Sequence, residues 1–63
     1  MINETLEFYK SKLSRKEALL SKLQAKENNL DYEMAPNETI QLHVLQAEVR
    51  MLKEFVEDLG DLA

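Results

Sequence analysis

The 63-residue sequence contains no cysteine, one histidine, one glycine and one proline. Without cysteine it can form neither a disulfide nor a thiolate metal site, and one histidine cannot make a histidine cluster. So few glycines and prolines suit long helices better than a β fold, which needs many turns. No apolar run approaches the roughly 18 residues that a transmembrane helix requires.

The first residues also lack the basic and apolar segments of a signal peptide, so we expect a cytoplasmic protein with no membrane association. A chain of this size rarely builds a core that contributes more than about 3–5 kcal/mol. With disulfides and metals excluded, oligomerisation is the remaining source of stability, and a homodimer is expected. No cofactor is expected, because the sequence has no nucleotide or metal motif and little room for a closed pocket.

The clearest pattern lies in the second half of the chain. Asn37 follows Pro36 and can cap a helix there, while Gly60 is placed to end it in a left-handed conformation. These signals predict a helix over about 38–59. Apolar residues spaced alternately three and four apart form its seam: Leu42, Leu45, Val49, Leu52, Val56 and Leu59.

The same helix has a second apolar stripe, which lies roughly 100° around the helix from the seam. One neighbouring helix cannot cover both surfaces, so the stripe is expected to pack on a second copy of the chain. Its members are Ile40, Val44, Met51, Phe55 and Leu62.

The first half follows a similar heptad frame, interrupted at Lys16 and Glu27. Asn3 is the expected cap, and the predicted helix runs over about 4–31, with a weak end at Asn28 and Asn29. The frame comprises Ile2, Leu6, Tyr9, Leu13, Leu20, Leu23 and Leu30.

Residues 32–37 form the expected loop, in which Pro36 keeps Ala35 out of the helical region. A connection this short makes the two helices antiparallel neighbours. The sequence therefore predicts one all-α domain over 1–63, an antiparallel two-helix hairpin that dimerises into a four-helix bundle. The expected core and dimer contacts are Leu42, Val44, Leu45, Val49, Met51, Leu52, Phe55, Val56 and Leu59.

Charge supports the hairpin but does not fix its register. Residues 1–30 carry six basic and four acidic side chains, and residues 31–63 carry two basic and eight acidic, so the two halves attract each other. If the numbers of paired residues add up to about 67, Glu17 meets Arg50 and Lys10 meets Glu57. The apolar layers fit totals of 65 or 72, so the register stays open.

Candidate chemistry is sparse. His43 lies beside the seam with no nucleophile or acid at helical spacing, which indicates a solvated surface residue and no enzyme. The basic side chains Lys12, Arg15, Lys22 and Lys26 could contact nucleic acid. The acidic second half competes for them and no aromatic series is present to stack bases, so nucleic-acid binding is the weaker interpretation.

Two resemblances bear on function. The opening segment, residues 1–13, and the second helix, residues 38–53, resemble small early-region proteins of lambda-like temperate phages, encoded between the exonuclease and excisionase genes. That resemblance implies a non-enzymatic regulator that biases phage development or disturbs the host cell cycle and replication by contacting a host or phage protein, and it transfers no functional residue. An antitoxin-like inhibitor is the version of this hypothesis in which the partner is an enzyme.

The helical layout is also similar to that of the Rop family of plasmid copy-number proteins. These are short hairpins that dimerise into a four-helix bundle and bind paired RNA loops. The resemblance implies an RNA-binding module as the alternative function. A shared layout does not imply a shared function, and the acidic second helix departs from a simple RNA-binding surface.

Overall fold

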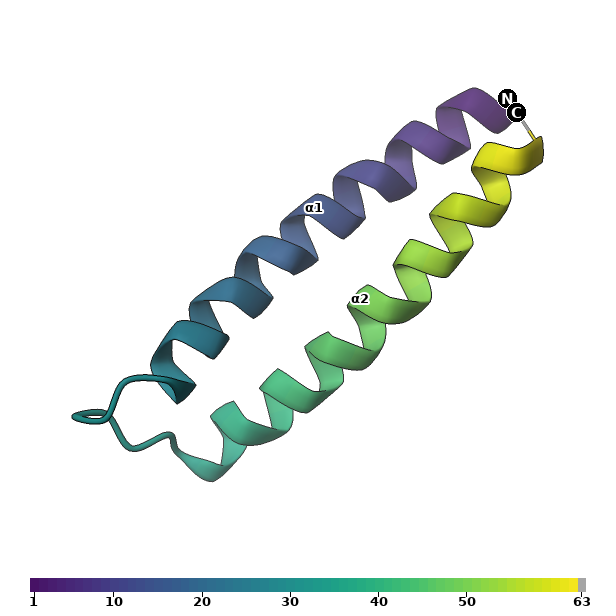
Figure 1. Ribbon diagram of the computed structural model, residues 1–63. Helices are drawn as coiled ribbons and strands as arrows, with labels where there is room; N and C mark the ends of the chain where they lie inside the picture. Colours follow the sequence, from purple (N-terminus) through teal and green to yellow (C-terminus); the bar gives the residue numbers. More distant parts are fainter. Residues whose placement is uncertain (63) are drawn as a thin grey trace.

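The computed structural model describes residues 1–62, which form two α-helices joined by one loop (Figure 1). Helix α1 spans Ile2–Glu27 and helix α2 spans Pro36–Leu62. They lie side by side and antiparallel, with the loop at one end and both termini at the other. The predicted all-α hairpin is confirmed, whereas residue 63 of the predicted domain lies outside the described part.

Helix α1 begins and ends earlier than predicted. It starts at Ile2, so Asn3 lies inside the first turn, and the N-cap residue Met1 makes no side-chain capping bond. It ends at Glu27 rather than near residue 31. Just beyond it, the Asn29 side chain accepts a 3.0 Å hydrogen bond from the backbone N–H of Asp31. That local bond favours a turn over another helical turn, and it leaves Leu30 fully exposed in the loop.

Helix α2 is longer than predicted at both ends. Pro36 is its first residue, a position where the missing N–H is no loss, so Asn37 lies inside the helix and is not its cap. Gly60 is also helical, and no glycine within residues 1–62 has a positive φ angle. Glycine permits a left-handed helix end but does not impose one, and here Asp61 and Leu62 continue the helix.

The core lies along the seam between the helices, and it is small. Four apolar side chains are buried, and Leu42 is the only one of them with no exposed surface: Leu6, Leu42, Leu45 and Val49. The remaining seam residues of α2, Leu52, Val56 and Leu59, are half-buried. Of the six predicted seam residues of α2, three are thus buried and three half-buried, while on α1 the buried residue, Leu6, lies near the N-terminus.

The register follows the apolar seam. Across the seam the aromatic rings of Tyr9 and Phe55 meet edge to face at 4.7 Å, and the Lys16 ammonium lies 2.9 Å from the Glu48 carboxylate. Lys26 and Glu38 form a third pair across the seam, with 3.0 Å between the ammonium nitrogen and a carboxylate oxygen. In each of these three pairs the residue numbers add up to 64. The apolar layers had allowed totals of 65 or 72, so the observed register differs from the first of these by one residue.

The ion pairs expected from a total of 67 are wrong. Glu17 lies 3.6 Å from Lys53 rather than beside Arg50, and Lys10 pairs with Glu7 on its own helix rather than with Glu57. These side chains are largely exposed, and exposed pairs contribute little free energy. The packing of the seam therefore overrides them in setting the register.

Substituting Gly60→Ala tests the unexpected continuation of α2. A Cβ atom at Gly60 would meet nothing within 4 Å, and alanine stabilises a helix interior by roughly 0.5–1 kcal/mol relative to glycine. Chemical denaturation at fixed protein concentration should show a gain of that order. Ala47→Gly, at an exposed position of the same helix, should give a comparable loss. A less stable Gly60→Ala protein would instead indicate a left-handed residue.

Candidate interaction surface

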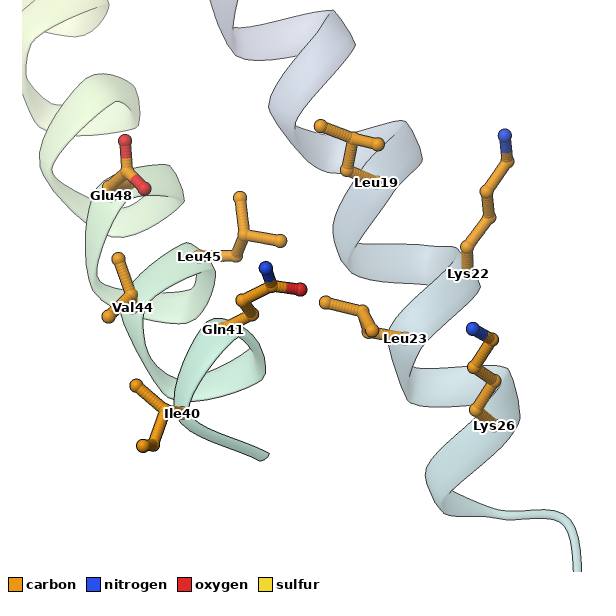
Figure 2. Close-up of a pocket in the computed structure, with 9 residues that line it drawn as sticks. All are labelled: Leu19, Lys22, Leu23, Lys26, Ile40, Gln41, Val44, Leu45 and Glu48. Carbon is orange, nitrogen blue, oxygen red and sulfur yellow. The ribbon is translucent and has the colours of Figure 1, made fainter. Parts of the chain in front are cut away.

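One broad side of the hairpin is hollowed by two shallow grooves that meet at Glu48. The larger groove lies towards the loop and has a volume of about 540 Å³ (Figure 2). The smaller lies towards the termini and has a volume of about 360 Å³. We refer to this side as the groove face. The larger groove is lined by Leu19, Lys22, Leu23, Lys26, Ile40, Gln41, Val44, Leu45 and Glu48. The smaller is lined by Tyr9, Lys12, Glu48, Met51, Leu52 and Phe55.

Helix α2 contributes an apolar stripe to the groove face. The stripe consists of large hydrophobic residues, yet their exposed fractions range from 42% for Phe55 to 70% for Leu62. The stripe comprises Ile40, Val44, Met51, Phe55 and Leu62. In Figure 2, Ile40 and Val44 lie on the outer side of α2, away from α1, whereas Leu45 points between the helices. The expected contacts thus divide into a seam that the hairpin buries and a stripe that it leaves uncovered.

Helix α1 contributes a basic row to the same face. Lys12, Lys22 and Lys26 line the grooves, and Arg15 shares their side of the helix because it lies three residues after Lys12 and seven before Lys22. Two exposed apolar side chains share this side by the same spacing, Phe8 at 57% and Leu19 at 49% exposure. The four residues predicted as nucleic-acid contacts therefore form one row, interleaved with apolar groups.

Lys26 in this row is already engaged within the chain. Its ammonium donates to the Glu38 carboxylate at 3.0 Å and lies 5.6 Å from the centre of the Tyr32 ring. The bond to Glu38 raises the pKa of the Lys26 ammonium. Of the four basic candidates, Lys26 is thus the one with an assigned structural role.

The carboxylate of Glu38 ties the loop to both helices. One oxygen accepts hydrogen bonds from the Tyr32 hydroxyl at 2.7 Å and the Ala35 N–H at 3.1 Å, and the other accepts from Lys26. Ala35 precedes the helix and Glu38 is its third residue, so this bond back to Ala35 is one half of a capping box. The joint comprises Lys26, Tyr32, Ala35 and Glu38.

These donors control the ionisation of the joint. The Tyr32 hydroxyl, then the Ala35 N–H and the Lys26 ammonium, lower the pKa of Glu38 to about 2. The same bond raises the pKa of the Tyr32 hydroxyl, since losing its proton would remove the donor. The sequence did not predict this joint, because Asn37 was the expected cap. The signal was Glu38 at the third position after Ala35, with proline between them.

His43 and the acidic side chains are the remaining candidates for chemistry. His43 is exposed on α2, as predicted. Within residues 1–62, no three histidine, aspartate or glutamate side chains gather closely enough to hold a metal ion. In the same part of the chain, neither helix combines the length and apolar character that crossing a membrane would require.

Substituting Glu38→Gln tests the joint through the pH dependence of stability. Because folding lowers the pKa of Glu38, its stabilising contribution is present above a pH of about 4.5 and is lost as the pH falls through about 2. The stability difference between the natural protein and Glu38→Gln should therefore shrink over this range in urea denaturation. Glu33→Gln, an exposed loop carboxylate, is the matched control and should show no such convergence. A difference that is constant with pH would contradict the role of the joint.

The sequence matches no model of a known protein family, and no curated protein or solved structure is significantly similar to it. The resemblances to phage early-region proteins and to the Rop family therefore stay hypotheses.

Proposed function

We propose that the chain is a non-enzymatic, cytoplasmic interaction protein that works as a homodimer and regulates a host or phage protein by contact. Two hairpins pair through their groove faces into a four-helix bundle, and the outer helix surfaces then bind the target. The observation that carries this proposal is the exposed apolar stripe of α2. Its side chains occur at regular helical spacing, and no element of the hairpin covers them.

Surface area supports a partner of the size of a second copy. The hairpin exposes 4935 Å², whereas a compact monomer of 7.3 kDa would expose about 4,200 Å². The excess of roughly 700–800 Å² is close to the ~800 Å² that each partner buries in a standard protein interface. One self-complementary contact would thus remove the surplus.

The shape of the hairpin gives the same indication. Its radius of gyration is 14.3 Å, and its Cα atoms extend over 46 × 14 × 14 Å. A compact domain of this length would have a radius of gyration of about 11 Å. A rod two helices wide becomes a four-helix bundle with one central core when a second rod covers its apolar side.

Substituting Val44→Asp tests the dimer. Val44 is 51% exposed in the hairpin, so aspartate there would remain hydrated in a single chain but would be buried in the dimer. At micromolar concentration, sedimentation should give twice 7.3 kDa for the natural protein and a single-chain mass, with reduced helix content, for the variant. His43→Asp makes the same charge change at the neighbouring exposed position and should preserve the dimer. Equal masses for both variants and the natural protein would contradict the proposal.

The basic row on α1 supports a second candidate, a dimeric RNA-binding module of the Rop type. With Lys26 set aside because it pairs with Glu38, two copies would present six basic side chains of the row, enough for several phosphate contacts. The two candidates compete for one surface, because pairing through the groove faces covers much of the row. An antitoxin-like inhibitor remains a version of the first proposal, with an enzyme as the target.

Binding to an RNA stem-loop separates the two candidates. The interaction proposal predicts no shift in gel electrophoresis at 150 mM salt, and no difference between the natural protein and Lys22→Gln. A shift that weakens steeply with added salt, and weakens again in Lys22→Gln, would instead favour the RNA-binding module, since each phosphate contact releases counterions.

A further inference from the structure

We infer that the two hairpins of the dimer lie with their loops at the same end, so that α1 of each copy packs on α2 of the other. This inference rests on the proposed dimer and adds its orientation and its pairing. It follows from how charge and apolar surface are divided across the groove face.

Two rods that pair face to face about a two-fold axis have two arrangements. If the axis runs along the helices, the loops lie at the same end and α1 covers α2 of the partner subunit. If the axis runs across the helices, the loops lie at opposite ends, α1 covers α1 and α2 covers α2. Both arrangements are isologous, so the same surface serves both copies.

Charge distinguishes the arrangements. The α1 half of the groove face carries the basic row. One acidic residue lies on the same side of the helix near its N-terminus, Glu4, eight residues before Lys12. The α2 half carries the apolar stripe and Glu48, while Lys53 of α2 points to a different contact, with Glu17. Opposite-end loops would pack α1 against α1 of the partner in antiparallel, which brings Lys12 and Arg15 of the two copies together at mid-length, where facing like charges cost free energy, although Lys26 would then lie near the partner's Glu4. Same-end loops place each basic row on the partner's apolar stripe and Glu48.

The register within the hairpin then fixes the contacts between the copies. Rotation about an axis along the helices does not move any residue along that axis. Residues of the two subunits are therefore level when their numbers add up to 64, as Tyr9 and Phe55, or Lys16 and Glu48, do within one hairpin. To within one residue, Leu19 is therefore level with Val44 of the partner subunit, and Phe8 with Phe55 of the partner subunit. Arg15 comes within one residue of the level of the partner's Glu48, which would then face two basic side chains, Arg15 across the interface and Lys16 of its own hairpin.

The apolar groups on this face agree with that pairing. Phe8 and Leu19 are the exposed large hydrophobic residues interleaved with the basic row, and each meets a member of the stripe when the loops coincide. The aliphatic stems of Lys12 and Lys22 can cover the remaining stripe while their ammonium groups reach solvent. The basic row and the stripe thus form two complementary halves of one interface.

Distances between spin labels test the orientation. The chain has no cysteine, so Glu33→Cys in the exposed loop and Asn3→Cys at the opposite end each give one labelled site per copy. Dimers of either variant should give label pairs within about 25 Å, because neighbouring helices lie about 8–10 Å apart. Mixed dimers of the two variants should give a distance near the 46 Å length of the hairpin.

The reverse pattern, with long distances in each single variant and a short one in the mixture, would overturn the orientation while leaving the dimer intact. Sedimentation of the same labelled samples separates the two levels of the proposal. A single-chain mass with no dipolar signal would overturn the dimer itself, and the orientation with it.

Discussion

Two helices in contact along one line can shield only one side of each other. Among residues 1–62, that line buries four apolar side chains, and of these Leu42 alone is shielded completely. The apolar surface of α2 is wider than the contact, so Val44 and Met51 remain at 51% and 69% exposure. The stability, the oligomeric state and the proposed function all depend on what covers that surplus surface.

The two ends of the hairpin are held by different kinds of contact. At the loop, Glu38 at the start of α2 accepts hydrogen bonds from three donors, one in α1 and two in the loop, and Lys26 adds its contact with the Tyr32 ring. Towards the termini the contacts are apolar instead: Leu6 is buried, the Tyr9 and Phe55 rings meet edge to face, and Leu52, Val56 and Leu59 are half-buried. Polar contacts therefore hold the loop end of the hairpin, and apolar contacts hold the terminal end.

Electrostatics has a different role from apolar burial. The ion pairs across the seam are partly or largely exposed, so their contribution to stability is small. The uneven division of charge between the helices nevertheless favours the hairpin, and in the proposed dimer it distinguishes one arrangement of the copies from the other. Charge therefore acts mainly on specificity, while burial supplies most of the free energy.

The sequence predicted the helical hairpin and its seam because heptad spacing reports directly on which side of a helix is buried. It predicted the exposed stripe of α2 for the same reason. It misplaced the helix ends, since Asn3, Asn37 and Gly60 are permissive signals that neighbouring residues override. The register was beyond it, because it depends on contacts between residues far apart along the chain, such as Lys26 with Glu38. The bond from Ala35 to Glu38 is local and had a sequence signal, but the assignment of the cap to Asn37 hid it.

The most direct test of the account is the dependence of the thermal unfolding midpoint on protein concentration. If the hairpin is stable only when a second copy covers its apolar stripe, unfolding is coupled to dissociation. The midpoint, followed by circular dichroism, should then rise by several degrees over a hundredfold increase in concentration, from about 1 to 100 µM. A midpoint that stays constant over this range, with a single-chain mass throughout, would show that the hairpin is stable alone and would contradict the account.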